Sequence, residues 1–286
     1  MKKVIRCMSL VFLLLFTGCF KEDPILENRM SNGELLVYDI ANKEFYTGTV
    51  ETTKVNHFNT RYVVMSSEVK DGRKHGITKE YYPNGKLTYE KNYKDGKQNG
   101  LTKHYYENGQ LSLEANYKDG KEDGIYKDYY PNGQLRVSGV AKDGKRDKIW
   151  KGYYEDGKLK YTEEYKNTKK NGGWDTFDQS GNLESLSTYK DDLPVGTWWT
   201  YHRGGQVRSE ENYKHGLKDG DSKTFYSSGQ VFSESTYSNG KLNGSFKKYY
   251  ANGKLQEEGY YINGKKEGTF TAVSYTHLRA HETCAD

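Results

Sequence analysis

A glycine recurs every 24 residues through most of this chain. The positions are Gly85, Gly109, Gly133, Gly157, Gly181, Gly205, Gly229 and Gly253. A second series with the same spacing runs from Gly76 to Gly268, and Lys148 is its single exception. A period this strict indicates an array of identical supersecondary units, each of which contacts mainly its neighbours. Such arrays are usually binding surfaces or spacers rather than enzymes.

Each repeat reads as one β-hairpin followed by a return turn. Asn84-Gly85 lies between two β-prone segments, and this dipeptide favours a type I′ turn because both of its central residues need positive φ. Asp95-Gly96 marks the second turn of the same repeat. Residues 76–267 show no helical periodicity, so we expect strands throughout.

A two-residue turn at Asn84-Gly85 fixes the strand register. It places Tyr82 opposite Leu87, Lys79 opposite Glu90, and Thr78 opposite Lys91. Other repeats support this register through further opposite charges and through aromatic residues facing glycine. These pairs are Lys103 with Glu114, Lys223 with Glu234, Lys247 with Glu258, Tyr126 with Gly139, and Phe246 with Gly259.

The register assigns the side chains to two faces. Tyr82, Leu87 and Tyr93 share one face with a stripe of tryptophans, and Tyr81, Lys79 and Glu90 lie on the other. The stripe consists of Trp150, Trp174 and Trp198, one repeat apart. It either packs the inner face of a curved sheet or contacts a partner or a glycan, since exposed aromatic residues are good contact anchors. The candidate binding surface comprises Trp150, Trp174, Trp198, Trp199, Tyr82, Tyr106, Tyr130 and Tyr154.

The repeats within 148–219 depart most from the common pattern. Asp175 and Trp199 replace lysine there, and Leu186 replaces glutamate. We expect specificity to reside in such departures.

The start of the chain has the features of a secretory signal. Lys2, Lys3 and Arg6 precede an apolar run that is too short to span a bilayer. Thr17-Gly18-Cys19 then resembles a bacterial lipobox, which predicts lipidation of Cys19. The expected location is the bacterial cell envelope, at the outer membrane if the cell is Gram-negative, because the residue after the cysteine is not Asp.

The end of the chain breaks the repeat abruptly. From about Ala272 the sequence resembles the translation of a sequencing-library adapter. The possible metal-binding trio of His277, His281 and Glu282 belongs to this tail, so we predict no metal site.

The predicted fold is all-β: an elongated array of antiparallel β-hairpins with a 24-residue period, forming a single twisted sheet. The predicted organisation is a signal peptide (1–18), a tether with an entry strand (19–44), a degenerate N-terminal repeat (45–75), eight full repeats with the start of a ninth (76–271), and the adapter-like tail (272–286). Tyrosine is abundant, with 27 residues, which fits a thin sheet with aromatic ladders better than a thick core.

The units Tyr-Tyr-Pro-Asn-Gly-Lys-Leu and Tyr-Lys-Asp-Gly-Lys-x-x-Gly resemble the MORN-repeat variant family of bacteria, over about residues 45–271. The resemblance implies stacked hairpins, protein or membrane-surface binding, and no catalysis. Members are often described as antitoxin-like, and many are exported or lipoproteins.

These features lead to a non-enzymatic, lipid-anchored envelope protein that binds or scaffolds an unidentified protein, without cofactors. Two alternatives remain: an antitoxin- or immunity-like partner of a toxin, and a cell-wall or glycan-binding module. The net charge of +5 is mild and the lysines are interspersed with acids, so nucleic acid is not expected as a partner.

Overall fold

The computed structural model describes residues 4–7, 26–31, 34–39, 42–55 and 59–272. All regular structure in these residues is β-strand, which confirms the all-β prediction. The chain divides into two compact units, 1–145 and 146–286, and each is described by itself. Cys19, most of the signal segment and residues 273–286 lie outside the described residues. Among the residues described, no helix has the length and apolar character needed to cross a membrane.

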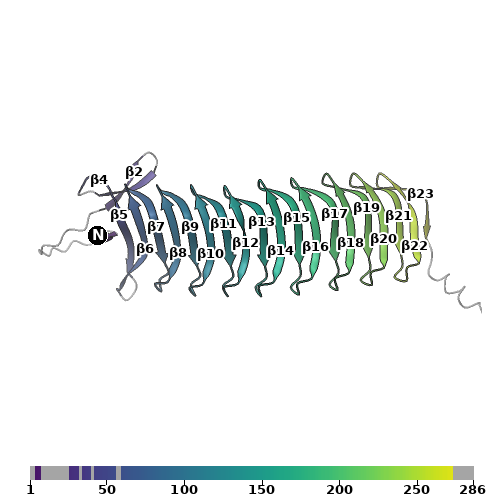
Figure 1. Cartoon of the computed structure of the whole chain (residues 1–286), viewed down its shortest axis with the longest axis horizontal. Helices are drawn as coiled ribbons and strands as arrows, with labels where there is room; N and C mark the ends of the chain where they lie inside the picture. Colours follow the sequence, from purple (N-terminus) through teal and green to yellow (C-terminus); the bar gives the residue numbers. More distant parts are fainter. Residues whose placement is uncertain (1–3, 8–25, 32–33, 40–41, 56–58, 273–286) are drawn as a thin grey trace, which may run out of the picture. The chain divides into compact units, whose positions relative to one another are not determined.

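Unit 1 contains a sheet whose strands follow one another in chain order, each antiparallel to the next (Figure 1). The strands are β5 (Gly48–Val55), β6 (Arg61–Lys70), β7 (Arg73–Tyr81), β8 (Leu87–Lys94), β9 (Lys97–Tyr105), β10 (Leu111–Lys118), β11 (Lys121–Tyr129) and β12 (Leu135–Lys142). A short strand, β1 (Val4–Cys7), pairs with β5 in parallel.

A smaller sheet of three antiparallel strands belongs to the same unit. It comprises β2 (Leu26–Ser31), β3 (Glu34–Asp39) and β4 (Glu44–Phe45). Tyr46, Val50 and Val69 form a small apolar cluster, against which Leu26 and Val37 pack. This cluster is the only hydrophobic core cluster that the described residues form.

The strands of unit 2 have the same chain-order topology, each antiparallel to the next. Its strands are β13 (Lys145–Tyr153, which begins at the unit boundary), β14 (Leu159–Lys166), β15 (Lys169–Phe177), β16 (Leu183–Lys190), β17 (Leu193–Tyr201), β18 (Val207–Lys214), β19 (Leu217–Phe225), β20 (Val231–Ser238), β21 (Lys241–Tyr249), β22 (Leu255–Ile262) and β23 (Lys265–Ala272). Within unit 2, no described element covers either face, and Trp150 is the one fully buried hydrophobic residue.

The predicted register is confirmed in the body of the hairpins. Lys79 lies opposite Glu90, and their side chains form an ion pair of 3.4 Å. Lys223 and Glu234 pair in the same way at 3.0 Å. The structure also contains the other predicted pairs: Lys103 with Glu114, Lys247 with Glu258, Tyr126 with Gly139, and Phe246 with Gly259. Each exposed ion pair stabilises the sheet by only about 0.2–1 kcal/mol.

The predicted type I′ turn at Asn84-Gly85 is wrong. Gly85 has a φ of 81°, whereas Asn84 does not have positive φ. The Gly85 amide donates to the Tyr82 carbonyl at 2.9 Å, and the Tyr82 amide donates to the Lys86 carbonyl at 2.8 Å. This is a three-residue loop in which a turn ends on a left-handed glycine. All eight glycines of the first series share this conformation, with φ between 81° and 92°.

The longer loop shifts the pairing next to the turn. Tyr81, rather than Tyr82, lies opposite Leu87. One residue later the register shifts again, between Glu80 and Tyr81, because β8 carries an extra residue there. This bulge compensates for the extra loop residue, and the predicted pairing of Lys79 with Glu90 is therefore restored.

The return turn at Asp95-Gly96 is the one that adopts the two-residue, doubly left-handed form. Asp95 and Gly96 have φ values of 51° and 82°, and Lys94 pairs with Lys97 across them. Every later return turn also has two consecutive positive φ values. In two of them the second residue is not glycine: Thr168 has a φ of 72°, and Asp192 has a φ of 71°.

The second glycine series lies in the returning strands, where the pairing is interrupted. The β8–β9 register shifts between Lys91 and Tyr93, opposite Gly100, which has a φ of 100°. Lys148, which replaces glycine in this series, also takes a positive φ of 57°. The backbone conformation is therefore imposed by the repeat, and Lys148 adopts it at a cost.

Prediction on turn strain. We expect Thr168→Gly to raise the free energy of unfolding by about 1 kcal/mol, because a β-branched residue at positive φ is strained by roughly 1–3 kcal/mol and glycine is not. Urea titration followed by circular dichroism gives the unfolding midpoint. Thr188→Gly in the middle of β16 is the matched control, and it should lower the midpoint because glycine weakens a strand interior. An unchanged or lower midpoint for Thr168→Gly would contradict the assignment of strain.

Candidate binding groove on unit 2

An aromatic ladder crosses β14 to β18 on one face of unit 2. Tyr165, Trp174, Tyr189, Trp198 and Tyr213 alternate along it, with successive ring centroids 5.5, 5.3, 5.1 and 4.4 Å apart. The ladder forms because these tryptophans and tyrosines occupy strand positions whose side chains point to the same side. We call this side the Trp face.

Hydrogen bonds orient both indole rings of the ladder. The Trp174 Nε1–H donates to the Glu164 carbonyl at 3.3 Å, and the Trp198 Nε1–H donates to the Thr188 carbonyl at 3.1 Å. In each case the acceptor lies on the preceding strand. Because the polar edge of each ring is engaged, the rest of the ring is held in place and half-exposed.

A row of hydroxyl groups runs beside the ladder on the same face. Thr176 pairs with Ser185 at 2.7 Å, Thr200 with Ser209 at 2.6 Å, and Thr224 with Ser233 at 2.6 Å. One repeat earlier, the corresponding pair is Gly152 and Tyr161. Because serine is much smaller than tyrosine, the Trp face is recessed in the repeats that follow Tyr161. We call this recessed part the floor.

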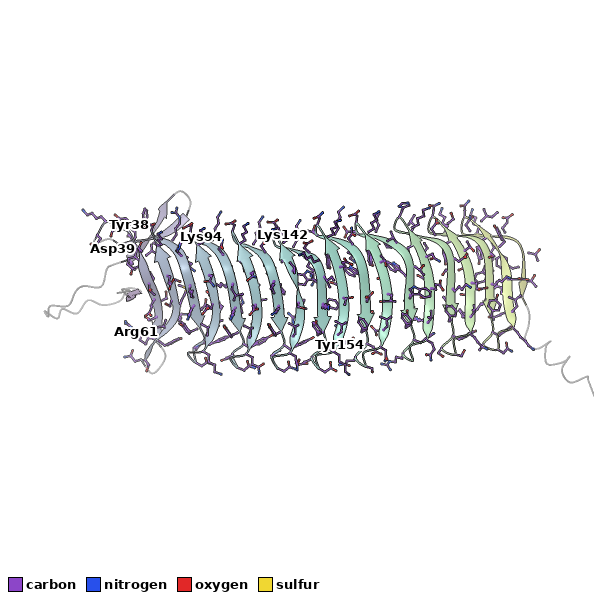
Figure 2. The ribbon with its side chains drawn as sticks, in the orientation of Figure 1. Tyr38, Asp39, Arg61, Lys94, Lys142 and Tyr154 are labelled. Carbon is purple, nitrogen blue, oxygen red and sulfur yellow. The ribbon has the colours of Figure 1, made fainter. Side chains whose placement is uncertain are left out.

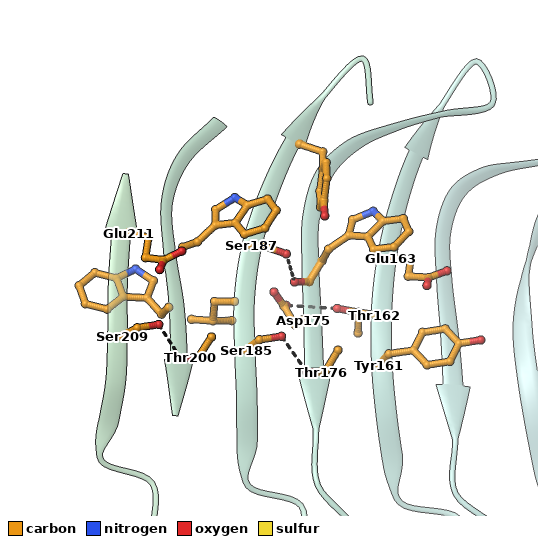
Figure 3. A pocket seen from close by; sticks show the side chains of 15 residues that line it. Tyr161, Thr162, Glu163, Asp175, Thr176, Ser185, Ser187, Thr200, Ser209 and Glu211 are labelled. Atoms are coloured by element: carbon orange, nitrogen blue, oxygen red, sulfur yellow. Dashed lines mark hydrogen bonds between the residues drawn. The ribbon is translucent and has the colours of Figure 1, made fainter. Parts of the chain in front are cut away.

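The lowered floor and the aromatic ladder together enclose a groove of about 390 Å³ (Figure 3). Its lining residues are Tyr161, Thr162, Glu163, Trp174, Asp175, Thr176, Ser185, Leu186, Ser187, Tyr189, Trp198, Trp199, Thr200, Ser209 and Glu211. Most of them lie on the Trp face by strand alternation. The others are Thr162, Asp175, Leu186 and Trp199, which occupy the alternate positions of the same strands.

Two carboxylates flank the groove, and each has a cationic partner. Glu163 accepts from Arg146, whose guanidinium lies 4.5 Å from the Trp150 ring centroid. Glu211 pairs with Lys218 at 2.6 Å and accepts a hydrogen bond of 2.8 Å from the Tyr213 hydroxyl. Burial, followed by this hydrogen bond, raises the pKa of Tyr213 above its ordinary value of 10.0.

The opposite face carries alternating lysine and glutamate in most repeats, and we call it the charge face. In unit 1 it runs through Lys79, Glu90, Lys103, Glu114 and Lys127, each opposite the next. In unit 2 the alternation is interrupted at Thr162, Asp175, Leu186 and Trp199, which are also cross-strand neighbours. It resumes with Glu210, Lys223, Glu234 and Lys247. Leu186 and Trp199 thus form an apolar pair, both partly exposed, within a charged row.

The repeat at residues 170–191 departs from the others in its turns as well; we call it the divergent repeat. In most other repeats a tyrosine occupies the position just before the first turn, and Tyr82, for example, donates to the Tyr105 carbonyl of the next repeat at 2.8 Å. In one repeat this residue is His202, whose Nε2 lies 3.0 Å from the Phe225 carbonyl. Asp178 occupies that position in the divergent repeat and accepts hydrogen bonds within its own turn. The strained residues Thr168 and Asp192 lie at its two ends.

The candidate surface residues of the sequence analysis lie in three places. Trp174 and Trp198 line the groove together, whereas Trp150 is only 4% exposed and is covered by Arg146. Trp199 occupies the alternate strand position, on the charge face.

Tyr82, Tyr106, Tyr130 and Tyr154 are not part of the groove. The hydroxyls of Tyr106 and Tyr154 donate to Tyr129 and Phe177 carbonyls, at 2.6 and 2.7 Å, in the same way as Tyr82. Figure 2 shows Tyr154 at the lower ends of the strands, next to the first turns of the hairpins. The Tyr130 amide donates to the Gln134 carbonyl in the corresponding turn.

Sequence reasoning did not identify the hydroxyl row. Ser185, Ser209 and Ser233 recur at the 24-residue period, as do Thr176, Thr200 and Thr224. This recurrence was the available signal. Among the described residues, no group of three or more His, Cys, Asp or Glu side chains is arranged to hold a metal ion.

Prediction on alkaline stability. A group with a raised folded pKa stabilises the fold fully below its unfolded pKa, and that contribution is lost as pH rises through the folded pKa. We therefore expect the urea midpoint to fall when pH increases from about 9 to about 11, and to fall less in Tyr213→Phe. At neutral pH the variant should lose about 1 kcal/mol with the hydrogen bond to Glu211. Tyr260→Phe, at an exposed position, is the control. An equal alkaline decrease in wild type and Tyr213→Phe would contradict the prediction.

Comparison with known proteins gives a family but no close relative. No curated protein matches the chain. A solved complex described as TcdB2-TccC3-Cdc42 aligns at 12% identity over 85% of this chain and 16% of that one, with a TM-score of 0.20. The TcdB2-TccC3 complex aligns at 13% identity over 84% and 16%, also with a TM-score of 0.20. The chain spans less than a fifth of either, and likenesses this weak carry no argument.

The MORN repeat variant family matches seven segments: 74–95, 98–119, 122–143, 146–167, 194–215, 218–239 and 242–263. The segments follow the 24-residue period, and the one period without a match is the divergent repeat, 170–191. Together the matches cover more than half of the sequence. The chain belongs to the MORN repeat variant family.

Proposed function

We propose that this protein is a non-enzymatic interaction protein, anchored by a lipid at Cys19 in the bacterial cell envelope, and that it binds a protein partner through the divergent repeat. The family supports a role in protein or membrane interaction. The basic start, the apolar run and Thr17-Gly18-Cys19 support the anchor. The partner would therefore be met at the membrane surface.

One observation carries the proposal: the alternation of lysine and glutamate on the charge face is interrupted from Thr162 to Trp199, across the repeat that the family does not match. Leu186 and Trp199 are cross-strand neighbours, at the positions where Glu114 and Lys127 form an ion pair in an earlier repeat. The cores of protein interfaces are depleted of charged residues and enriched in aromatic ones. A few such residues usually carry most of the binding free energy.

The architecture does not favour catalysis. A catalytic site needs a nucleophile, a base and oxyanion donors gathered in one pre-organised pocket. In the groove, Glu163 and Glu211 are engaged by cations, and the hydroxyls of Thr176 and Thr200 are paired with serines. None of the lining residues is histidine, cysteine or lysine. These are the properties of a binding surface.

Prediction on partner capture. The full chain, immobilised, should capture a partner from solubilised native envelope, and Leu186→Glu with Trp199→Lys should capture at least about tenfold less. This double variant restores the residue types that most other repeats carry, so the fold should be preserved. Quantitative mass spectrometry of the captured proteins provides the measurement.

The matched control exchanges the charges of an ordinary pair, Lys223→Glu with Glu234→Lys, and should capture normally. Equal capture by wild type and the Leu186→Glu/Trp199→Lys variant would refute the proposed interface. A captured toxin whose activity the protein neutralises would identify the role as that of an antitoxin.

A further inference from the structure

The groove on the Trp face points to a second ligand of a different class. We infer that it binds a neutral, linear polysaccharide strand along the row of Thr/Ser pairs. This inference goes beyond the protein-binding role, because it concerns the side chains of the Trp face, whereas Leu186 and Trp199 occupy the alternate strand positions of the charge face.

The two glutamates that flank the groove are already paired with cations. Glu163 is paired with Arg146, and Glu211 with Lys218. A charged ligand would have to displace one of these partners or be desolvated without compensation, which is unfavourable. The groove therefore favours a neutral ligand.

The floor supplies hydrogen-bonding groups in a repeating arrangement. In each Thr/Ser pair, one hydroxyl donates to the other, which leaves one donor and several acceptor positions free for a ligand. Two of the pairs, Thr176/Ser185 and Thr200/Ser209, line the groove one repeat apart, and two strand spacings correspond to roughly 9–10 Å. A linear polymer rich in hydroxyl groups matches such a periodic row better than a compact molecule does.

The wall supplies apolar surface in a fixed orientation. Trp174 and Trp198 are held by their Nε1–H bonds, so little side-chain entropy is lost when a ligand contacts them. The C–H groups on the faces of a sugar ring are weakly positive and pack against the negative faces of aromatic rings. The groove thus provides hydroxyls beside aromatic rings, which complements the two kinds of surface on a pyranose.

An extended peptide fits this site less well. Peptides that bind sheets commonly add a strand at a free edge. Strands β15 to β18, which form the groove, are each paired on both sides, so their main-chain groups are engaged. A peptide would leave its own amide groups to compete for the few hydroxyl donors.

The test is titration calorimetry of the full chain with cellohexaose and chitohexaose, and with an acidic hexagalacturonate for comparison. We expect at least one neutral hexasaccharide to bind, and the acidic one to bind at least about tenfold more weakly. Absence of binding by both neutral sugars, or preference for the acidic one, would overturn the inference.

The variants use a pair that the chain already contains. Thr176→Gly with Ser185→Tyr transplants the Gly152/Tyr161 pair into the groove and should abolish sugar binding by filling it. Thr200→Val removes a single hydroxyl with little change of shape and should weaken binding about tenfold. Its fold can be verified by circular dichroism, so the test does not depend on the double variant. Normal binding by Thr200→Val together with the filled variant would refute the site.

Controls separate this inference from the protein interface. Ser138→Tyr introduces the same side chain on the charge face of unit 1, opposite Lys127, and should bind sugar normally. In the reverse test, Thr200→Val, which weakens sugar binding, should still capture the protein partner, because Thr200 does not belong to the Leu186–Trp199 pair. Loss of sugar binding in Ser138→Tyr would mean that the groove does not carry it, and loss of partner capture by Thr200→Val would mean that the two surfaces are not separate.

Discussion

The pairing of each strand with the next supports the whole structure, because the described residues of unit 2 form no second layer against which its side chains could be buried. Trp150 is its one fully buried hydrophobic residue, so hydrophobic burial contributes less here than in a domain with two packed layers. Turns and bulges must then hold every strand in register. This explains why the positions with positive φ recur so strictly while most other positions vary. The glycine spacing is the backbone requirement of an uncovered sheet.

Two uncovered faces leave the side chains free to serve binding. On the charge face, the alternating ion pairs contribute little stability each, and replacing one pair by Leu186 and Trp199 costs the fold little. On the Trp face, replacing Tyr161 by Ser185 in the next repeat removes aromatic contact area but creates a groove. In both cases one repeat changes its surface while the backbone of the array is kept.

The period, the register in the body of the hairpins, and the separation of the tryptophans from the lysine–glutamate pairs could be predicted from the sequence, because they follow from spacing and from the alternation of side chains. The first turn could not be predicted correctly from Asn84-Gly85 alone. Pro83 precedes this dipeptide and favours a negative φ at the first loop position, and the Asn84 side chain accepts from the Lys86 amide at 3.0 Å. The loop therefore has three residues. The groove was missed because it arises from small residues, Ser185 and Ser209, whose effect depends on the rings beside them.

Backbone strain and surface divergence coincide in the same part of the chain. Thr168 and Asp192 lie at either end of the divergent repeat. Each is the second residue of a return turn and takes a left-handed conformation, although it is not glycine. Asp178 also replaces the tyrosine that in most other repeats precedes the first turn. Each change reduces local stability, and none is needed to form the hairpin, since other repeats do without them. Strain of this kind persists where the surrounding structure enforces it, and it clusters at functional sites. The coincidence with the groove and with the Leu186–Trp199 pair therefore argues that this repeat has been shaped by binding rather than by folding.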